Sequence, residues 1–306
     1  MLATGRIAAL HVALWSFDRW YRLWWYIWPA STALLVCGWI YVDKSTGTNT
    51  SSAPWGKPVS NAPAQPIRRS PVLADWPEKL HNDVMTCFSN AVDLNPLIEA
   101  CTRLIDSGQA DNRQLVATYL QRGFLQRLKQ PDRALADYDA ALNIQPDATA
   151  VLTNRAWIYM SRSRYDAALE DLNKAIALSP PALAAHSRYY RGYSFLRLKD
   201  YPSAMSDLNE ALRVEPNNPD PYLARGETEQ AQQLYDAALR DYDEFSKRAP
   251  RDPRGLIARG SVMEATGRSK EALAAYESAV ALDPANARAL AARDRLRSGQ
   301  NAVTRA

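Results

Sequence analysis

The chain has 306 residues, 47% of them hydrophobic, and its 37 basic and 33 acidic side chains give a formal net charge of +4. Residues 1–75 hold 7 of the basic and 3 of the acidic side chains, so residues 76–306 carry 30 of each and are neutral overall. This balance argues against a nucleic-acid-binding domain, which normally presents a basic face with a large positive charge.

The first predicted element is a transmembrane helix over residues 23–42. These 20 residues carry no charged side chain, and about 20 apolar residues are needed for a helix to cross a hydrocarbon core of about 30 Å. Tryptophan and tyrosine crowd both ends of the run, as expected of interfacial anchors. Three arginines precede the run and two lysines follow it, a bias that places residues 1–22 in the cytoplasm and exports the rest of the chain. A cleaved signal peptide and the reversed topology are the alternatives.

A flexible linker is predicted to follow over residues 43–75. This stretch is rich in Ser, Thr, Asn, Ala and Pro, a composition that cannot bury enough apolar surface to fold. The linker would therefore tether the rest of the chain to the membrane.

Residues 76–114 are predicted to form an atypical helical repeat, with one helix near residues 76–89 and another near residues 96–107. Cys87 and Cys101 would face each other across this hairpin, and such a pair favours a disulfide in an oxidising compartment. Closing a loop of this size stabilises the folded state by about 3 kcal/mol in the chain-entropy model. Two buried thiols are the alternative.

Between residues 115 and 286 a segment of 34 to 36 residues repeats five times. A proline lies near the end of each copy, and successive prolines are 34, 36, 34 and 34 residues apart. A period of this size is typical of stacked helical hairpins. Apolar residues at helical spacing before each proline predict one amphipathic helix, and another helix precedes it across a short breaker. The closing prolines are Pro146, Pro180, Pro216, Pro250 and Pro284.

An arginine in the first helix of four repeats is followed 15 or 16 residues later by an aspartate in the second helix. This regular spacing predicts structural ion pairs between the two helices rather than an acid–base role, each worth about 0 to 1 kcal/mol if exposed. In the fifth repeat, Arg259 aligns with Ala275 and is expected to lack the partner. The predicted pairs are Arg122 with Asp137, Arg155 with Asp171, Arg191 with Asp207 and Arg225 with Asp241.

The repeated pattern resembles the tetratricopeptide repeat, most specifically in Asn154-Arg-Ala-Trp-Ile-Tyr159 and in Tyr165-Asp-Ala-Ala-Leu169. The resemblance implies an all-α, right-handed superhelical solenoid, with residues 287–306 supplying a C-terminal capping helix and tail. Two departures stand out. The first repeat is one residue short between Gly123 and Ala134, and the fourth has Phe245 in place of a small residue. The five repeats are 115–148, 149–184, 185–218, 219–252 and 253–286.

The resemblance also implies a concave groove, lined by the first helix of every repeat, in which residues not needed for packing recognise a partner. Aromatic rings with a few polar groups suit an extended or helical peptide. The alternative for each ring is packing between helices. Family members that clamp the acidic C-termini of heat-shock chaperones use lysines and asparagines there, and Asn154 is the one match, so that ligand class is not expected. The predicted groove residues are Phe124, Asn154, Trp157, His186, Tyr189, Tyr190 and Tyr193.

No catalytic chemistry is visible in the sequence. The histidines and cysteines do not have metal-ligand spacing, and there is no Gly-rich phosphate loop or nucleophile elbow. We therefore expect no catalytic residue, metal, cofactor or small-molecule substrate. The expected function is a non-enzymatic adaptor for proteins or peptides, anchored by a single span in a bacterial inner membrane, with its repeats in the periplasm. The alternative is a subunit of an envelope enzyme complex whose active site lies in or with a partner chain.

Overall fold

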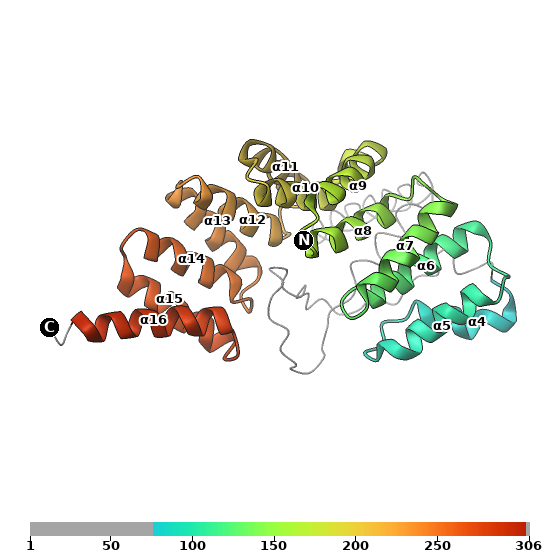
Figure 1. Ribbon diagram of the computed structural model, residues 1–306, viewed down its shortest axis with the longest axis horizontal. Helices are drawn as coiled ribbons and strands as arrows, with labels where there is room; N and C mark the ends of the chain where they lie inside the picture. The colour runs from blue at the N-terminus through green and yellow to red at the C-terminus, as the bar shows by residue number, and fades with distance from the viewer. Residues whose placement is uncertain (1–75, 304–306) are drawn as a thin grey trace, which may run out of the picture.

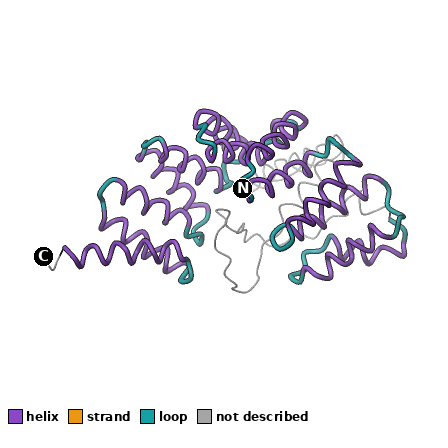
Figure 2. The backbone as a smooth tube through the Cα atoms, in the orientation of Figure 1, coloured by secondary structure: helices purple, strands orange, loops and turns teal. Residues whose placement is uncertain are grey.

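The computed structural model describes residues 76–303, with side chains as far as residue 298. These residues form thirteen α-helices and two short 3-10 helices, without a strand in this range (Figures 1 and 2). The prediction of an all-α solenoid is therefore confirmed. The predicted transmembrane helix over 23–42 and the predicted linker over 43–75 lie outside the described residues. Among residues 76–303, no helix has the length and apolar character that a membrane span requires.

Consecutive helices pack as hairpins that follow one another along an arch (Figure 1). The N-terminal hairpin comprises the 3-10 helix η1 (Glu78–Leu80), α4 (His81–Cys87) and α5 (Leu94–Asp106). The other elements are α6 (Asn112–Gln126), α7 (Pro131–Ile144), α8 (Thr149–Ser161), α9 (Tyr165–Leu178), η2 (Pro181–Leu183), α10 (Ala185–Arg197), α11 (Tyr201–Val214), α12 (Asp220–Ala231), α13 (Tyr235–Arg248), α14 (Arg254–Ala265), α15 (Ser269–Leu282) and α16 (Ala287–Val303). The first helices of the five repeats are α6, α8, α10, α12 and α14, and the second helices are α7, α9, α11, α13 and α15.

The curvature of the arch follows from how the first helices approach one another. Each first helix packs against the next, α6 against α8, α8 against α10, α10 against α12 and α12 against α14, in addition to its contacts with second helices. A layer of closely spaced helices lies on the inside of a curved stack. At the top of the arch α8 and α10 accordingly lie on the inner side, with α9 and α11 outside them (Figure 1).

Glycine in the first helices makes room for a tyrosine ring of the second. A Cβ atom on Gly226 would lie 2.5 Å from Cε1 of Tyr242, a distance that the close-packed interior cannot accept. Gly123 and Gly260 meet the rings of Tyr138 and Tyr276 in the same way. In the second repeat the two equivalent positions are occupied by Ala156 and Leu172, which are both fully buried. An alanine is possible there because leucine replaces the tyrosine ring.

The turns inside the hairpins explain why the first repeat is one residue shorter. Ser163, Lys199, Gln233 and Gly267 each have a positive φ, between 57° and 75°, in the turn between the first and second helix of repeats two to five. The turn between α6 and α7 has no such residue. The first repeat thus lacks the one turn residue that has a positive φ in the other repeats, and both of its helices are formed.

Phe245 in the fourth repeat is accommodated by its neighbours. Its ring is fully buried, and a Cβ atom on Gly255 of α14 would lie 2.7 Å from its Cδ1. In the other repeats a small residue at this position leaves space for the next hairpin. In the fourth repeat Gly255 of that next hairpin leaves the space for the Phe245 ring.

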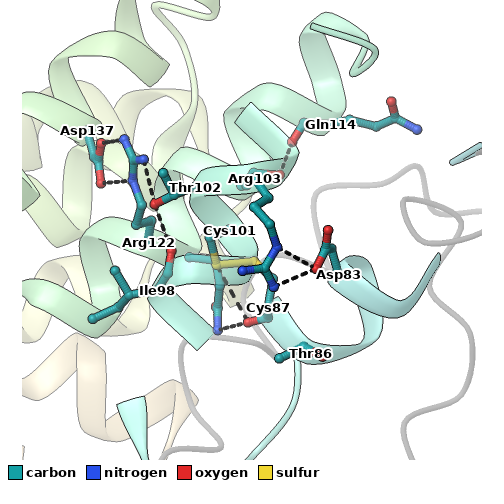
Figure 3. Close-up of a disulfide and its surroundings, with 12 residues drawn as sticks. Asp83, Thr86, Cys87, Ile98, Cys101, Thr102, Arg103, Gln114, Arg122 and Asp137 are labelled. Atoms are coloured by element: carbon teal, nitrogen blue, oxygen red, sulfur yellow. Dashed lines mark hydrogen bonds and ion pairs between the residues drawn. A yellow bond between two sulfur atoms is a disulfide. The ribbon is translucent and has the colours of Figure 1, made fainter. Parts of the chain in front are cut away.

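The N-terminal hairpin is closed by a disulfide between Cys87 and Cys101, with a Cα–Cα distance of 4.9 Å (Figure 3). Both cysteines are fully buried. Arg103 of α5 pairs with Asp83 of α4 at 2.7 Å, and Gln121 of α6 donates a hydrogen bond to the Cys87 carbonyl. The helix expected near residues 76–89 is shorter than predicted, since α4 spans His81–Cys87.

The four predicted arginine–aspartate pairs are formed, with nitrogen–oxygen distances of 2.6 to 3.0 Å through two nitrogens of each arginine. The third nitrogen, Nη1, reaches the preceding hairpin: Arg155 donates to Asp139, and Arg225 donates to Asn209. Each arginine therefore joins its own hairpin to its neighbour. Arg259 has Ala275 in place of the aspartate of its own hairpin, but its Nε lies 3.2 Å from the carboxylate of Asp243 in the preceding hairpin, a contact that was not predicted.

Candidate partner-binding surface

The seven predicted groove residues all lie on first helices that contact one another. Phe124 is on α6, Asn154 and Trp157 are on α8, and His186 and three tyrosines are on α10. A buried contact between the hydroxyls of Thr153 and Ser187, 2.8 Å apart, joins α8 to α10 directly. The side chains of one helix are thus held in a fixed relation to those of the next.

Four side chains on α10 form an aromatic cluster because residues 186, 189, 190 and 193 fall on one face of a helix. The ring centroids of His186 and Tyr190 lie 4.2 Å apart with an edge-to-face orientation, and those of Tyr189 and Tyr190 lie 5.2 Å apart. Tyr189 and Tyr193 are 7% and 4% exposed and belong to the hydrophobic core. His186 and Tyr190 are half-buried, so they present the accessible part of the cluster.

Asn154 has a local role. Its Nδ2 donates a hydrogen bond to the Ala150 carbonyl one turn earlier in the same helix, at 2.8 Å. The structure therefore uses the donor of this side chain within α8 and leaves its oxygen for other contacts.

Arg127, which is not among the predicted groove residues, completes the aromatic surface. Arg127, the residue after α6, has its guanidinium carbon 3.5 Å from the ring centroid of Phe124 and 5.2 Å from that of Trp157. A cation over two aromatic faces is attracted by their quadrupoles. The helical spacing from Phe124, three residues earlier, is the signal that could have indicated Arg127.

Burial keeps His186 and Tyr190 uncharged beside Arg127. Burial lowers the pKa of His186 to about 4, and the positive charge of Arg127 adds to the effect. Burial raises the pKa of the Tyr190 phenol above its ordinary value. At neutral pH both side chains are therefore uncharged, which suits them to contacts with apolar groups and hydrogen bonds rather than to proton transfer.

Beyond α10 the same face becomes charged. Asp220 and Arg254 lie 34 and 68 residues after His186, at equivalent places in the repeat, and they form an ion pair at 2.9 Å. Arg254 also pairs with Asp252 at 2.8 Å. Glu227, 34 residues after Tyr193, is half-buried on α12, and burial raises the pKa of its carboxyl. The 34-residue offsets, read beyond the third repeat, would have found these residues.

Two further observations on residues 76–298 bear on the choice of site. No group of three or more potential metal ligands occurs among those residues. A cavity of about 290 Å³ lies between α14, α15 and α16, where Arg295 pairs with Glu264 at 2.7 Å. This cavity is on other hairpins than the aromatic cluster, which remains the candidate site.

Comparison with known proteins identifies the repeat. The model of the tetratricopeptide repeat family matches residues 125–182, 155–220 and 222–287, which is more than half of the chain. A tetratricopeptide repeat protein from Parabacteroides merdae has a similar structure, with a TM-score of 0.60 and 23% identity over 73% of this chain and 85% of that one.

Two further solved structures share the fold. PilW, described as a widely conserved type IV pilus biogenesis factor, gives a TM-score of 0.61 and 17% identity over 71% of this chain and 99% of its own. PilF from Pseudomonas aeruginosa gives a TM-score of 0.54 and 16% identity over 67% and 90%. At these identities the similarity shows the fold and leaves the ligand open.

Proposed function

Because the chain belongs to the tetratricopeptide repeat family, we propose that it is a non-enzymatic scaffold that binds a partner polypeptide along its first helices. The observation that carries this proposal is the run of half-buried rings that crosses from α8 to α10. Trp157, His186 and Tyr190 each keep part of their surface accessible, whereas neighbouring rings are in the core.

Such a surface is suited to binding because large rings gain contact area at a small cost in conformational freedom. Tryptophan and tyrosine dominate the binding free energy of protein interfaces, with about 2 kcal/mol or more for each central residue. Their neighbours Tyr189 and Tyr193 are fixed in the core, so the accessible rings are pre-positioned. A partner would thus meet an ordered surface, which reduces the entropic cost of association.

Anchoring in the membrane is the second part of the proposal. It is supported by the uncharged run over residues 23–42 and by the arginines that precede it. The repeats would then lie in the periplasm of a bacterium, on a linker over residues 43–75. Confinement near the bilayer raises the effective concentration of any partner in the same membrane.

Double substitution of Trp157 and Tyr190 by alanine in the full-length chain tests the binding function. Proteins captured by the wild-type chain from solubilised native membranes are identified by quantitative mass spectrometry and compared with those captured by the variant. We expect specific partners to be lost. The matched control is Tyr165→Ala with Tyr201→Ala, two half-buried rings on the second helices. Equal capture by the variant and wild type would contradict the proposal.

The predicted topology is tested by a single accessible thiol. Lys129, exposed in the turn after α6, is replaced by cysteine, and a membrane-impermeant maleimide is added to cells with a permeabilised outer membrane. Labelling before lysis is the expected result. Labelling that requires rupture of the inner membrane would place the repeats in the cytoplasm.

A further inference from the structure

We propose that the aromatic end of the first-helix surface binds an acidic side chain of the partner polypeptide, with Arg127 as the counter-charge. This inference rests on the proposed binding function and names the chemistry of its ligand. The contact would be a carboxylate held by the guanidinium of Arg127, beside an apolar side chain held by the rings of α8 and α10.

The geometry of Arg127 is that of a positioned recognition group. Its guanidinium carbon lies 3.5 Å from the Phe124 ring centroid and 5.2 Å from the Trp157 ring centroid. The two rings come from different hairpins, so the guanidinium is oriented by both. A planar guanidinium held in this way presents its donors in a fixed fork that matches a carboxylate.

The charge of Arg127 is not balanced by the described part of the chain. Its Nε is buried and makes no hydrogen bond to a described residue, and no carboxylate among residues 76–298 pairs with it. Its pKa is lowered by burial. A half-buried cation without a counter-charge loses hydration free energy that the two rings repay only in part, and a carboxylate that contacts its terminal nitrogens Nη1 and Nη2 would supply the missing interaction.

Five other arginines of the repeats are paired with carboxylates, which Arg127 is not within residues 76–298. Arg122, Arg155, Arg191 and Arg225 are each bonded to an aspartate through two nitrogens. On the charged part of the surface, Arg254 is paired with two carboxylates. Arg127 alone among these six has aromatic rings in place of an acid, which leaves its terminal nitrogens Nη1 and Nη2 for a ligand.

The surroundings select an acidic residue beside an apolar one. His186 and Tyr190 are uncharged at neutral pH, and the positive charge of Arg127 contributes to the low pKa of His186. The carboxylate of Asp220 acts on Tyr189 and Tyr190, whereas the charge that acts on His186 is that of Arg127. Positive charge and apolar contact area therefore occur together where His186 faces Arg127. The proposed ligand is therefore one acidic side chain within the partner polypeptide. It differs from the acidic C-termini that the lysines and asparagines of other family members clamp.

Peptide selection on the full-length chain tests the proposal. A phage library of random dodecapeptides is selected in detergent micelles on the wild-type chain and on the variants Arg127→Gln and Arg133→Gln. Arg133 is exposed on the second helix α7 and serves as the matched control. Selected peptides are then synthesised as fluorescent pairs, one with its Asp and Glu residues and one with Asn and Gln.

We expect the wild type and Arg133→Gln to select peptides with an acidic residue next to an apolar one. The amide version of each peptide should bind about tenfold or more weakly, and Arg127→Gln should weaken the acidic peptide by a similar factor while leaving the amide version unchanged. Arg127→Lys keeps the charge without the planar fork and should lie between the two. The thermal unfolding of each variant verifies that it is folded.

Peptides that bind through Trp157 without preferring an acid would overturn this inference and leave the binding function standing. The same conclusion follows if Arg127→Gln binds acidic and amide peptides as the wild type does. Failure to select any peptide would overturn both this inference and the proposed binding function. A preference for inorganic phosphate over the carboxylate at equal concentration would overturn the ligand class.

Discussion

Nε of Arg259 on α14 lies 3.2 Å from the carboxylate of Asp243 on α13, in the preceding hairpin. Arg155 and Arg225 also contact the preceding hairpin, and each of them bonds an aspartate of its own hairpin as well. Arg259 has the first contact and lacks the second, because Ala275 occupies the place of the aspartate. Arg155 and Arg225 therefore close their own hairpins and join them to the preceding ones, whereas Arg259 makes the contact between hairpins alone.

Substitution of Ala275 by aspartate should complete the missing pair and stabilise the array. Ala275 is buried, so the new carboxylate gains from Arg259 but would be costly without it. We expect the free energy of unfolding in urea to rise in the wild type and to fall in the Arg259→Met background. The coupling between the two positions should be about 1 kcal/mol or more. Additive effects of the two substitutions would show that the pair does not form.

The contact of Gly226 with the Tyr242 ring gives a second test of the packing. Gly226→Ala should lower the free energy of unfolding by about 1 to 3 kcal/mol, because the added methyl group overlaps the ring. Adding Tyr242→Leu should restore part of that loss, since alanine and leucine are the native residues at these places in the second repeat. Urea denaturation measures both values. A double variant less stable than Gly226→Ala would contradict the account.

The helices were predictable from the sequence because their signals are local. The 34-residue period, the closing prolines and the apolar spacing indicate hairpins without knowledge of how they stack. Contacts between hairpins were not predictable in this way. The pairing of Arg259 with Asp243 and the stacking of Arg127 on Trp157 each join residues of different repeats.

The candidate site was likewise predictable where it depends on one helix and not where it depends on contacts between hairpins. Helical spacing correctly places residues 186, 189, 190 and 193 on one face of α10. Whether a ring on that face is accessible depends on the neighbouring hairpins, which bury Tyr189 and Tyr193 and leave Tyr190 half-buried. Sequence spacing alone carries no information on this difference.

Glu229 on α12 predicts a pH dependence of stability. Burial, with the nearby charge of Asp241 adding to it, raises the pKa of Glu229 from 4.5 to about 7. Folding thus favours the protonated carboxyl, so its contribution is full below about pH 4.5 and is lost as the pH rises through 7. Relative to the wild type, Glu229→Gln should have an unchanged urea midpoint at pH 4.5 and a higher midpoint at pH 8.

Glu170, exposed on α9, provides the matched control for this experiment. Glu170→Gln should show the same difference from the wild type at both pH values. If the profiles of Glu229→Gln and wild type are parallel from pH 4.5 to 8, the shifted titration of Glu229 does not exist.

The disulfide should stabilise the N-terminal hairpin in particular. α4 and α5 have a neighbouring hairpin on one side within the described residues, and the bond closes a loop with a sequence separation of 14, worth about 3 kcal/mol in the chain-entropy model. Replacing Cys87 and Cys101 by serine should accelerate amide hydrogen exchange in α4 and α5 and leave α10 to α13 unchanged. Reductant should reproduce this in the wild type and have no effect on the variant. An equal acceleration in all hairpins would contradict the local role.

The central claim is that a partner polypeptide lies along the first helices, and site-specific photocrosslinking in native membranes tests it most directly. The photoreactive amino acid p-benzoylphenylalanine is placed at Tyr190, on the first helix α10, or at Lys174, exposed on the second helix α9. The account predicts that illumination links a partner protein to the chain from position 190 and not from position 174. Links from 174 without links from 190 would contradict it.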